Sequence, residues 1–221
     1  MLQKMTLVER VLLTPDILQL LLNPSEPFDY QAGDYVLLGL DEADLKPFSI
    51  ASAPRLDGMI ELHIRNHDNS DWMVALFEVQ RYDTLFVQGP KAQYQLDANL
   101  DKPLIFVAGG TGFAPMKALL EVALKQGGEQ IIEFYWGART AADLYQHTDM
   151  LSLCKQYPNL NYLPVVSEED FGGRTGLVHQ AVLQDHPDLS GFRVYLCGPW
   201  PMQQTAKADF LAAGLPESQF N

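Results

Sequence analysis

The sequence predicts two domains of different architecture, an antiparallel β-rich half followed by a parallel α/β half, in a chain of 221 residues. In the first half, short apolar segments alternate with turn residues, which is typical of antiparallel strands. From residue 104 onwards, strand-like and helix-like segments alternate four times, which is typical of a parallel sheet covered by helices. The segment 97–103 between them is polar and ends in a proline. We therefore expect domains at residues 1–99 and 100–221.

Six strands and one helix are expected in the first half. Turn residues such as Thr14-Pro15-Asp16 separate the apolar segments. The expected strands cover residues 6–13, 17–22, 35–40, 48–51, 59–65 and 84–87. The segment 71–80 has apolar residues at helical spacing, and Ser70 before it is a suitable N-cap. Six short strands with one helix predict a small six-stranded antiparallel β-barrel.

Four βα units are expected in the second half. The strands cover residues 104–108, 131–136, 161–166 and 193–197, and the helices cover residues 115–125, 142–156, 175–184 and 201–213. The first strand is apolar throughout, as a strand buried on both faces is. Thr175 is a candidate N-cap of the third helix, and Gly214 is a candidate C′ residue of the fourth.

Charge and composition exclude several classes of function. The net charge is −13, with 15 Lys and Arg against 28 Asp and Glu. Nucleic acids and anionic membranes bind clustered basic residues, so we expect neither as a partner. No apolar run approaches the roughly 20 residues of a membrane helix, and the N-terminus lacks the apolar stretch of a secretory signal. A cytoplasmic protein is expected.

The cysteines and histidines predict no metal centre. Cys154 and Cys197 are too few for an iron–sulfur cluster held by four thiolates or for a cysteine-rich zinc site. His63 and His67 lie four residues apart, but that spacing does not converge on a strand.

A glycine-rich turn follows the first strand of the second half. Gly109, Gly110 and Gly112 come directly after the apolar segment 104–108, and Pro115 stands where a first helical turn tolerates a missing N–H. This arrangement presents backbone N–H groups and a helix N-terminus to a phosphate. By itself the pattern fits an ordinary tight βα turn equally well.

Three motifs together resolve that ambiguity. The segment KPFSIAS at 46–52, the segment GGTGFAP at 109–115 and CGP at 197–199 occur in this order. With these motifs the chain resembles the ferredoxin–NADP reductase superfamily, and within it the small NAD(P)H:flavin oxidoreductases. The resemblance implies a barrel that binds flavin (FAD or FMN), a second domain that binds NADH or NADPH, and hydride transfer from nicotinamide C4 to flavin N5.

The resemblance assigns flavin contacts in the first domain. It places Phe48 along the isoalloxazine ring and the Ser49 hydroxyl at N5. Relatives usually carry arginine at Lys46, and lysine lacks its bidentate geometry, so a flavin should be held less firmly and could act as an exchangeable substrate. The complete set of expected flavin contacts is Lys46, Pro47, Phe48, Ser49, His63, Ile64 and Ser70.

The resemblance assigns the nucleotide contacts to the second domain. Thr111 in the glycine loop is expected at a phosphate or the carboxamide, and Cys197 beside nicotinamide C4, where it shapes the gap for hydride transfer. Arg139 either contacts the adenosine ribose or is a surface charge, and it does not choose between NADH and NADPH. The complete set is Gly109, Gly110, Thr111, Gly112, Pro115, Arg139, Cys197, Gly198 and Pro199. Ser49 and Cys197 are the expected catalytic residues.

Two other functions remain open from the sequence. One is a reductase that keeps its flavin bound and passes electrons to a protein acceptor, such as a ferredoxin or an oxygenase component. The other is a non-catalytic subunit that binds nucleotide for regulation. The weak phosphate contacts expected at Lys46 and at segment 66–70 are consistent with the second.

Overall fold

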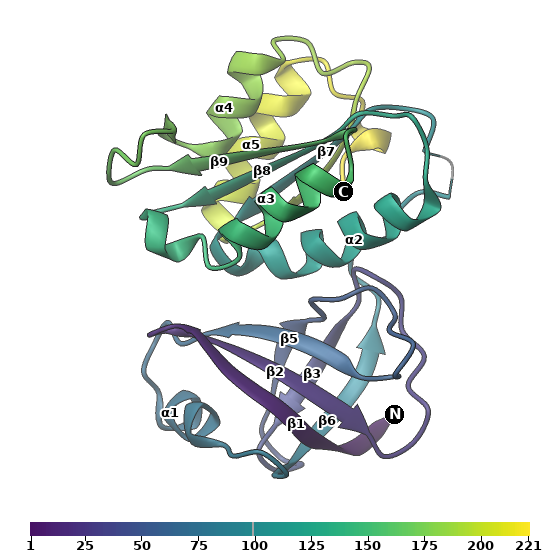
Figure 1. Cartoon of the computed structure of the whole chain (residues 1–221), viewed down its shortest axis with the longest axis vertical. Coiled ribbons are helices and arrows are strands. Elements are labelled where there is room, and N and C mark those ends of the chain that lie inside the picture. Colours follow the sequence, from purple (N-terminus) through teal and green to yellow (C-terminus); the bar gives the residue numbers. More distant parts are fainter. Residues whose placement is uncertain (99) are drawn as a thin grey trace. The chain divides into compact units, whose positions relative to one another are not determined.

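The computed structural model describes residues 1–98 and 100–221. Two compact units make up the chain (Figure 1). Unit 1 contains Met1–Leu96 and Lys117–Val122, and unit 2 contains Asp97–Met116 and Ala123–Asn221.

Unit 1 is a six-stranded antiparallel barrel, as predicted (Figure 1). Its strands are β1 (Leu2–Thr14), β2 (Ile17–Pro24), β3 (Tyr35–Gly39), β4 (Leu45–Ser49), β5 (Ile60–Arg65) and β6 (Thr84–Lys91). They pair in the order β4-β3-β6-β1-β2-β5. A bridge between Ile50, which follows β4, and Leu62 of β5 joins the two ends of this order. Closing the sheet leaves no long unpaired edge.

Alternation along β5 separates the barrel core from its outer face. Leu62 and Ile64 lie fully buried in the apolar core, whereas Glu61 and His63 alternate with them and point the other way. The single helix of unit 1, α1 (Asp71–Glu78), begins as predicted, because the Ser70 side chain accepts a hydrogen bond from the Met73 N–H.

Unit 2 is a parallel sheet covered on both faces, as predicted (Figure 1). Its strands are β7 (Leu104–Gly109), β8 (Ile132–Ala138), β9 (Leu160–Val166), β10 (Arg174–Thr175) and β11 (Arg193–Cys197), in the order β10-β9-β8-β7-β11. Its helices are α2 (Phe113–Gln126), α3 (His147–Gln156), α4 (Val178–Asp185) and α5 (Trp200–Ala212), with short 3₁₀ turns η1 (Gly110–Gly112), η2 (Ala141–Asp143) and η3 (Glu217–Gln219).

Each face of the unit 2 sheet buries apolar side chains. On one face, Val182 of α4 and Phe210 of α5 share an apolar cluster with Val107 of β7. An aromatic group that includes Phe106 and Phe134 packs elsewhere in the core. All six residues of β7 are buried, as expected for a central parallel strand.

Two details of unit 2 correct the predictions. The helix expected from residue 142 begins at His147, because Thr140 and Asp143 form a capping box around the separate turn η2. Thr175 is not an N-cap, because it pairs with Val166 in β10 and α4 begins only after Leu177. By contrast, the Gly214 N–H donates to the Leu211 carbonyl after α5, as predicted.

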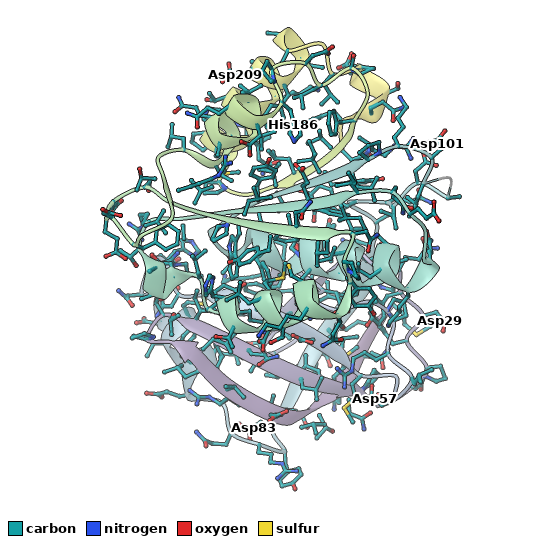
Figure 2. All side chains as sticks on the ribbon, turned by 45° about the horizontal axis from the view of Figure 1, so that its top comes forward. Asp29, Asp57, Asp83, Asp101, His186 and Asp209 are labelled. Carbon is teal, nitrogen blue, oxygen red and sulfur yellow. The ribbon has the colours of Figure 1, made fainter. Side chains whose placement is uncertain are left out.

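The acidic excess lies on the surface of both units. Asp29, Asp57 and Asp83 of unit 1 and Asp101 of unit 2 are exposed (Figure 2). Exposed carboxylates of this kind are solvated. Within the described residues, no helix combines the length and the apolar character that a membrane crossing requires.

Unit 1 also contains a buried charge network on the outer face of β5. The Glu61 carboxylate accepts hydrogen bonds from His63 Nε2 at 2.7 Å and from Gln19 Nε2 at 2.9 Å. Lys117 Nζ, in the part of α2 that belongs to unit 1, lies 3.4 Å from the same carboxylate. Burial opposes ionisation of Glu61, but His63 and Lys117 outweigh it and lower its pKa to about 2. Burial also lowers the pKa of His63, so its ring is neutral at pH 7.

We predict that Glu61→Gln destabilises the chain at pH 7 by about 1–3 kcal/mol, because it removes the anion that faces Lys117. The pKa of Glu61 falls from 4.5 to about 2 on folding, so its stabilisation is complete above pH 4.5 and fades as pH falls towards 2. Urea denaturation of both proteins between pH 7 and pH 2.5 tests this. The difference between them should shrink below pH 4.5, and a constant difference would contradict the assignment.

Candidate functional site

The residues of the KPFSIAS motif form one wall of a pocket in unit 1. Pro47, Phe48 and Ser49 of β4 line a cavity of about 440 Å³. The remaining lining residues are Tyr35, which pairs with Ser49 in the β3–β4 register, and Gln93, which follows β6. Aromatic and apolar surfaces with a few polar groups are the usual lining of a site for a planar ligand. These residues therefore fit an isoalloxazine ring.

The Ser49 hydroxyl is chemically available in this pocket. Ser49 is partly exposed, and within residues 1–98 and 100–221 its hydroxyl has no hydrogen-bond partner. A serine hydroxyl can donate and accept at the same time. It is therefore suited to a ring nitrogen whose protonation state changes.

Trp72 of α1 supports the pocket from behind Phe48. The two rings stack with their centroids 6.0 Å apart and their planes 13° apart. Phe48 also packs against the barrel core, so its ring is held on two sides. The sequence interpretation used Trp72 only for helical periodicity and did not assign it to the site.

The charge of Lys46 is already engaged within unit 1. Lys46 Nζ lies 3.0 Å from Asp44 Oδ1 and 5.0 Å from the centroid of the Trp72 ring. Lys46 does not line the pocket. Both partners are partly exposed, so the ion pair contributes little stability, but it competes with a ligand phosphate for the cation.

The three remaining residues expected at the flavin lie near β5 and α1. His63 is buried and bonded to Glu61. The Ile64 side chain lies in the barrel core, which leaves only its backbone for a ligand. The Ser70 hydroxyl caps α1. The structure thus brings Pro47, Phe48 and Ser49 together in one pocket. His63, Ile64 and Ser70 have other partners within unit 1.

In unit 2, the glycine loop has the backbone geometry of a phosphate cradle. Gly110 has a φ of +54°, which favours glycine over residues with a side chain. Its carbonyl accepts a hydrogen bond from Trp136 Nε1 at 2.9 Å. Pro115 lies in the first turn of α2. The Trp136 contact fixes the orientation of the loop carbonyl, and the helix N-terminus that follows favours an anion.

The glycine loop packs directly against the end of β11. A Cβ at Gly112 would collide with the backbone carbonyl of Cys197 and the amide of Gly198. Cys197 pairs with Ala108 in the β7–β11 register. Gly198 is held by a 2.6 Å bond from Gln203 Nε2 to its carbonyl oxygen. The GGTG and CGP motifs therefore meet at the carboxyl ends of neighbouring strands.

Arg139 lies at the same edge of the sheet. It follows β8, which is the neighbour of β7 on the other side from β11, and its side chain is exposed. Thr111 lies in η1 and Pro199 precedes α5. Ligands of open parallel sheets bind at this edge. The charge of Arg174 in β10 already has a partner, because it forms a 2.6 Å ion pair with Asp185.

Sequence reasoning missed four residues that shape these two sites. They are Tyr35, Trp72, Gln93 and Trp136. The pairing of Tyr35 with Ser49 depends on strand register, and the Trp136 contact depends on the order of the parallel strands. For Trp72 the sequence did contain a signal, because an aromatic residue stands in the first turn of the predicted helix. Among the described residues, no group of three or more His, Cys, Asp or Glu side chains is placed to hold a metal ion.

Family comparisons agree with this division of sites. Residues 4–96 match the oxidoreductase FAD-binding domain, and residues 106–208 match the oxidoreductase NAD-binding domain. Both the barrel pocket and the glycine loop lie within these matches.

Two curated relatives and one solved structure are informative. The chain is 39% identical over 208 residues to the CDP-6-deoxy-L-threo-D-glycero-4-hexulose-3-dehydrase reductase of Yersinia pestis, covering 92% of this chain and 62% of that protein. It is 32% identical to the NAD(P)H-flavin reductase of Vibrio harveyi, covering 87% of this chain and 84% of that protein. A cytochrome P450 reductase of Amycolatopsis superposes with a TM-score of 0.92 at 26% identity, covering 100% of this chain and 69% of that one.

The chain thus spans less than two thirds of the length of the Yersinia relative and most of the length of the Vibrio one. The barrel with its KPFSIAS pocket, the parallel sheet with its glycine loop and these relatives lead to one conclusion. The chain belongs to the ferredoxin reductase-like family of oxidoreductases, with a FAD-binding domain followed by an NAD-binding domain.

Proposed function

We propose that this chain is an NAD(P)H-dependent flavin reductase whose flavin is an exchangeable substrate. The observation that carries the proposal is the barrel pocket lined by Pro47, Phe48 and Ser49, which offers a flat apolar wall and an uncommitted hydroxyl. We assign flavin binding to residues 1–99 and nucleotide binding to residues 100–221. The Vibrio harveyi relative is named an NAD(P)H-flavin reductase, and the chain covers 84% of that protein, which supports the assignment.

When bound, the reduced nicotinamide supplies a hydride from C4 to flavin N5. The chain's own residues orient the reactants. Phe48, held by Trp72, supports the flavin ring, and the Ser49 hydroxyl bonds N5. The Gly109–Gly112 loop binds the pyrophosphate through backbone N–H groups, and Cys197 with its small side chain leaves room beside nicotinamide C4. No protein nucleophile is required for this reaction.

We expect an exchangeable flavin because the charge of Lys46 already has partners within unit 1. Its ammonium group is shared between Asp44 and the Trp72 ring. A flavin phosphate would have to displace that carboxylate, and lysine offers no bidentate grip in return. We therefore expect recognition to rest on the ring, with reduced flavin leaving after the reaction.

A second function is favoured by two other relatives. The Yersinia pestis and Amycolatopsis proteins are named as reductases of a dehydrase and of a cytochrome P450. In this alternative, flavin remains bound and electrons pass to a protein acceptor.

Purified protein distinguishes the proposed functions. We expect colourless protein that oxidises NADH or NADPH only after riboflavin or FMN is added, as followed at 340 nm. Yellow protein that retains flavin through gel filtration would favour the protein-acceptor alternative. No oxidation with any flavin, together with measurable nucleotide binding, would favour a non-catalytic subunit.

We predict that Ser49→Ala lowers kcat and kcat/KM together by roughly 10- to 100-fold, since a hydrogen bond that strengthens in the transition state is worth ~1.4–2.7 kcal/mol. Stopped-flow bleaching of flavin by NADH separates this step from flavin release. Ser25→Ala, at an exposed turn after β2, is the control and should behave as the wild type. An unchanged bleaching rate in Ser49→Ala would remove Ser49 from the mechanism.

We predict that Gly110→Val raises the nucleotide KM at least tenfold and leaves flavin affinity within twofold. A β-branched residue is strained at a φ of +54° and would move the loop backbone away from the pyrophosphate. Gly191→Val is the matched control in unit 2, because a Cβ there meets no atom within 4 Å. A parallel loss of flavin affinity would show that the loop assignment is wrong.

We predict that Lys46→Arg tightens FMN binding about fivefold or more and leaves riboflavin binding unchanged. Arginine can pair with Asp44 and still present further N–H groups to the phosphate, which is worth about 1 kcal/mol. Titration of flavin fluorescence with both ligands measures this, and riboflavin, which has no phosphate, is the internal control. Equal changes for the two flavins would reject the role of Lys46 as a phosphate contact.

A further inference from the structure

The segment that follows β4 is irregular, and several of its backbone groups have hydrogen-bond partners. Directly after Ser49 and Ile50, the backbone of Ala51, Ser52 and Ala53 belongs to no strand or helix. All three residues are nevertheless buried, with exposed fractions of 0 to 2%. Buried irregular backbone needs a hydrogen-bond partner for each polar group.

These partners come from three directions within unit 1. The Ala51 N–H donates to the backbone carbonyl of Glu61 at 2.7 Å. The Ser52 hydroxyl lies 3.1 Å from the Tyr30 hydroxyl, which in turn donates to the Ala53 carbonyl at 2.9 Å. Two further groups, the Ala51 carbonyl and the Ala53 N–H, are bonded by charged side chains of α2.

Lys117 and Glu121 are those side chains. Lys117 Nζ donates to the Ala51 carbonyl at 2.9 Å, and Glu121 Oε2 accepts from the Ala53 N–H at 2.8 Å. The two side chains also pair with each other at 2.8 Å. The third neighbour of Lys117 Nζ is the Glu61 carboxylate, at 3.4 Å. The three ammonium hydrogens of Lys117 thus have three acceptors, which fixes its position.

The same network reaches the residue opposite Ser49. The antiparallel bridge between Ile50 and Leu62 sets the register, which places Ser49 across from His63. His63 Nε2 is bonded to Glu61. Two neighbours of Ser49 therefore depend on the network. One is His63, which lies across from it, and the other is the backbone of residues 51–53, which follows Ser49.

Stability alone is a poor explanation for these charges, of which Glu61 is buried and Lys117 and Glu121 are half-buried. A buried ion pair loses much of its Coulombic gain to desolvation, and an apolar cluster of similar volume is often as stable. What an apolar cluster cannot do is bond the Ala51 carbonyl and the Ala53 N–H. The charged side chains therefore fix the backbone geometry of residues 51–53.

We propose that Lys117 and Glu121 are positioning residues for Ser49, and that they hold the 51–53 backbone so that the Ser49 hydroxyl meets flavin N5. This rests on the proposed function as a flavin reductase. Neither residue touches a reacting atom, and both act through the backbone two to four residues beyond Ser49. Glu61 has the supporting role of orienting Lys117 and His63.

The test compares two pairs of variants with the full-length wild type. Lys117→Met removes the ammonium group at nearly constant volume, and Lys125→Met removes an exposed lysine from the same helix as its control. Glu121→Leu removes the acceptor of the Ala53 N–H, and Glu121→Gln keeps an oxygen there. Amide hydrogen exchange of peptides covering 49–53 in the flavin-free protein, riboflavin titration and stopped-flow flavin reduction are measured for each.

We expect faster exchange in 49–53, at least fivefold weaker riboflavin binding and about tenfold slower flavin reduction in Lys117→Met and Glu121→Leu. The nucleotide KM should stay within twofold, Glu121→Gln should recover most of the effect, and Lys125→Met should match the wild type. Lower melting temperatures with unchanged riboflavin binding and reduction rate would overturn the proposal.

The exchange and titration also separate this inference from the function it rests on. If the wild type reduces no flavin, the proposed function fails, and the exchange and riboflavin titration still decide the positioning role. In that case, weaker riboflavin binding with faster exchange supports it, and unchanged binding overturns it. If Lys117→Met does not fold, the pair of Glu121 variants decides in the same way.

Discussion

The contacts of the Lys117 ammonium group are the interaction on which, in our proposal, the geometry around Ser49 depends. This group bonds a backbone carbonyl and two carboxylates at once, and all three acceptors belong to unit 1. Removing one member of such a group leaves the others buried and unpaired, which costs more than the bond itself. The contacts of Lys117 therefore depend on one another, and together they fix the backbone that follows Ser49.

The nucleotide side relies on strand topology instead of charge. Parallel strands end at one edge of the sheet, so Gly109 at the end of β7 and Cys197 at the end of β11 come together although they lie 88 positions apart in the sequence. Gly112 then packs against the Cys197 backbone so closely that a side chain has no room. The Trp136 indole fixes the Gly110 carbonyl from the next strand. Aromatic and backbone contacts give this loop its shape.

Local sequence signals predicted the architecture well because they are strong in this chain. Turn residues and alternation identified the barrel strands, and the apolar segment before the glycine loop identified β7. Errors arose where a short-range signal had two outcomes. Thr175 is a good N-cap by type, but pairing with Val166 placed it in a strand. The helix expected from residue 142 starts later because Asp143 completes a capping box with Thr140.

Sequence reasoning could not find the residues whose roles depend on tertiary contacts. From the sequence, no role was assigned to Lys117, Glu121 or Glu61, and His63 was expected at the flavin. Their meeting requires that this part of α2 cover the outer face of β5, which no local pattern encodes. Likewise, Trp72 has the helical spacing of a core residue, and only the structure shows that its ring stacks on Phe48.

The net charge of −13 explains why the two sites use different devices for anionic ligands. The acidic protein repels a phosphate at long range, so phosphate binding must rely on short-range hydrogen-bond donors. The glycine loop meets this need with backbone N–H groups, whose partial charges are independent of the protein's net charge. The barrel pocket differs, because Lys46 is paired with Asp44 and the pocket is lined by Phe48, whose ring stacks on Trp72. Under the proposed function, the nucleotide is held by its phosphates and the flavin by its ring, and this difference is what we expect of a reductase that releases its flavin.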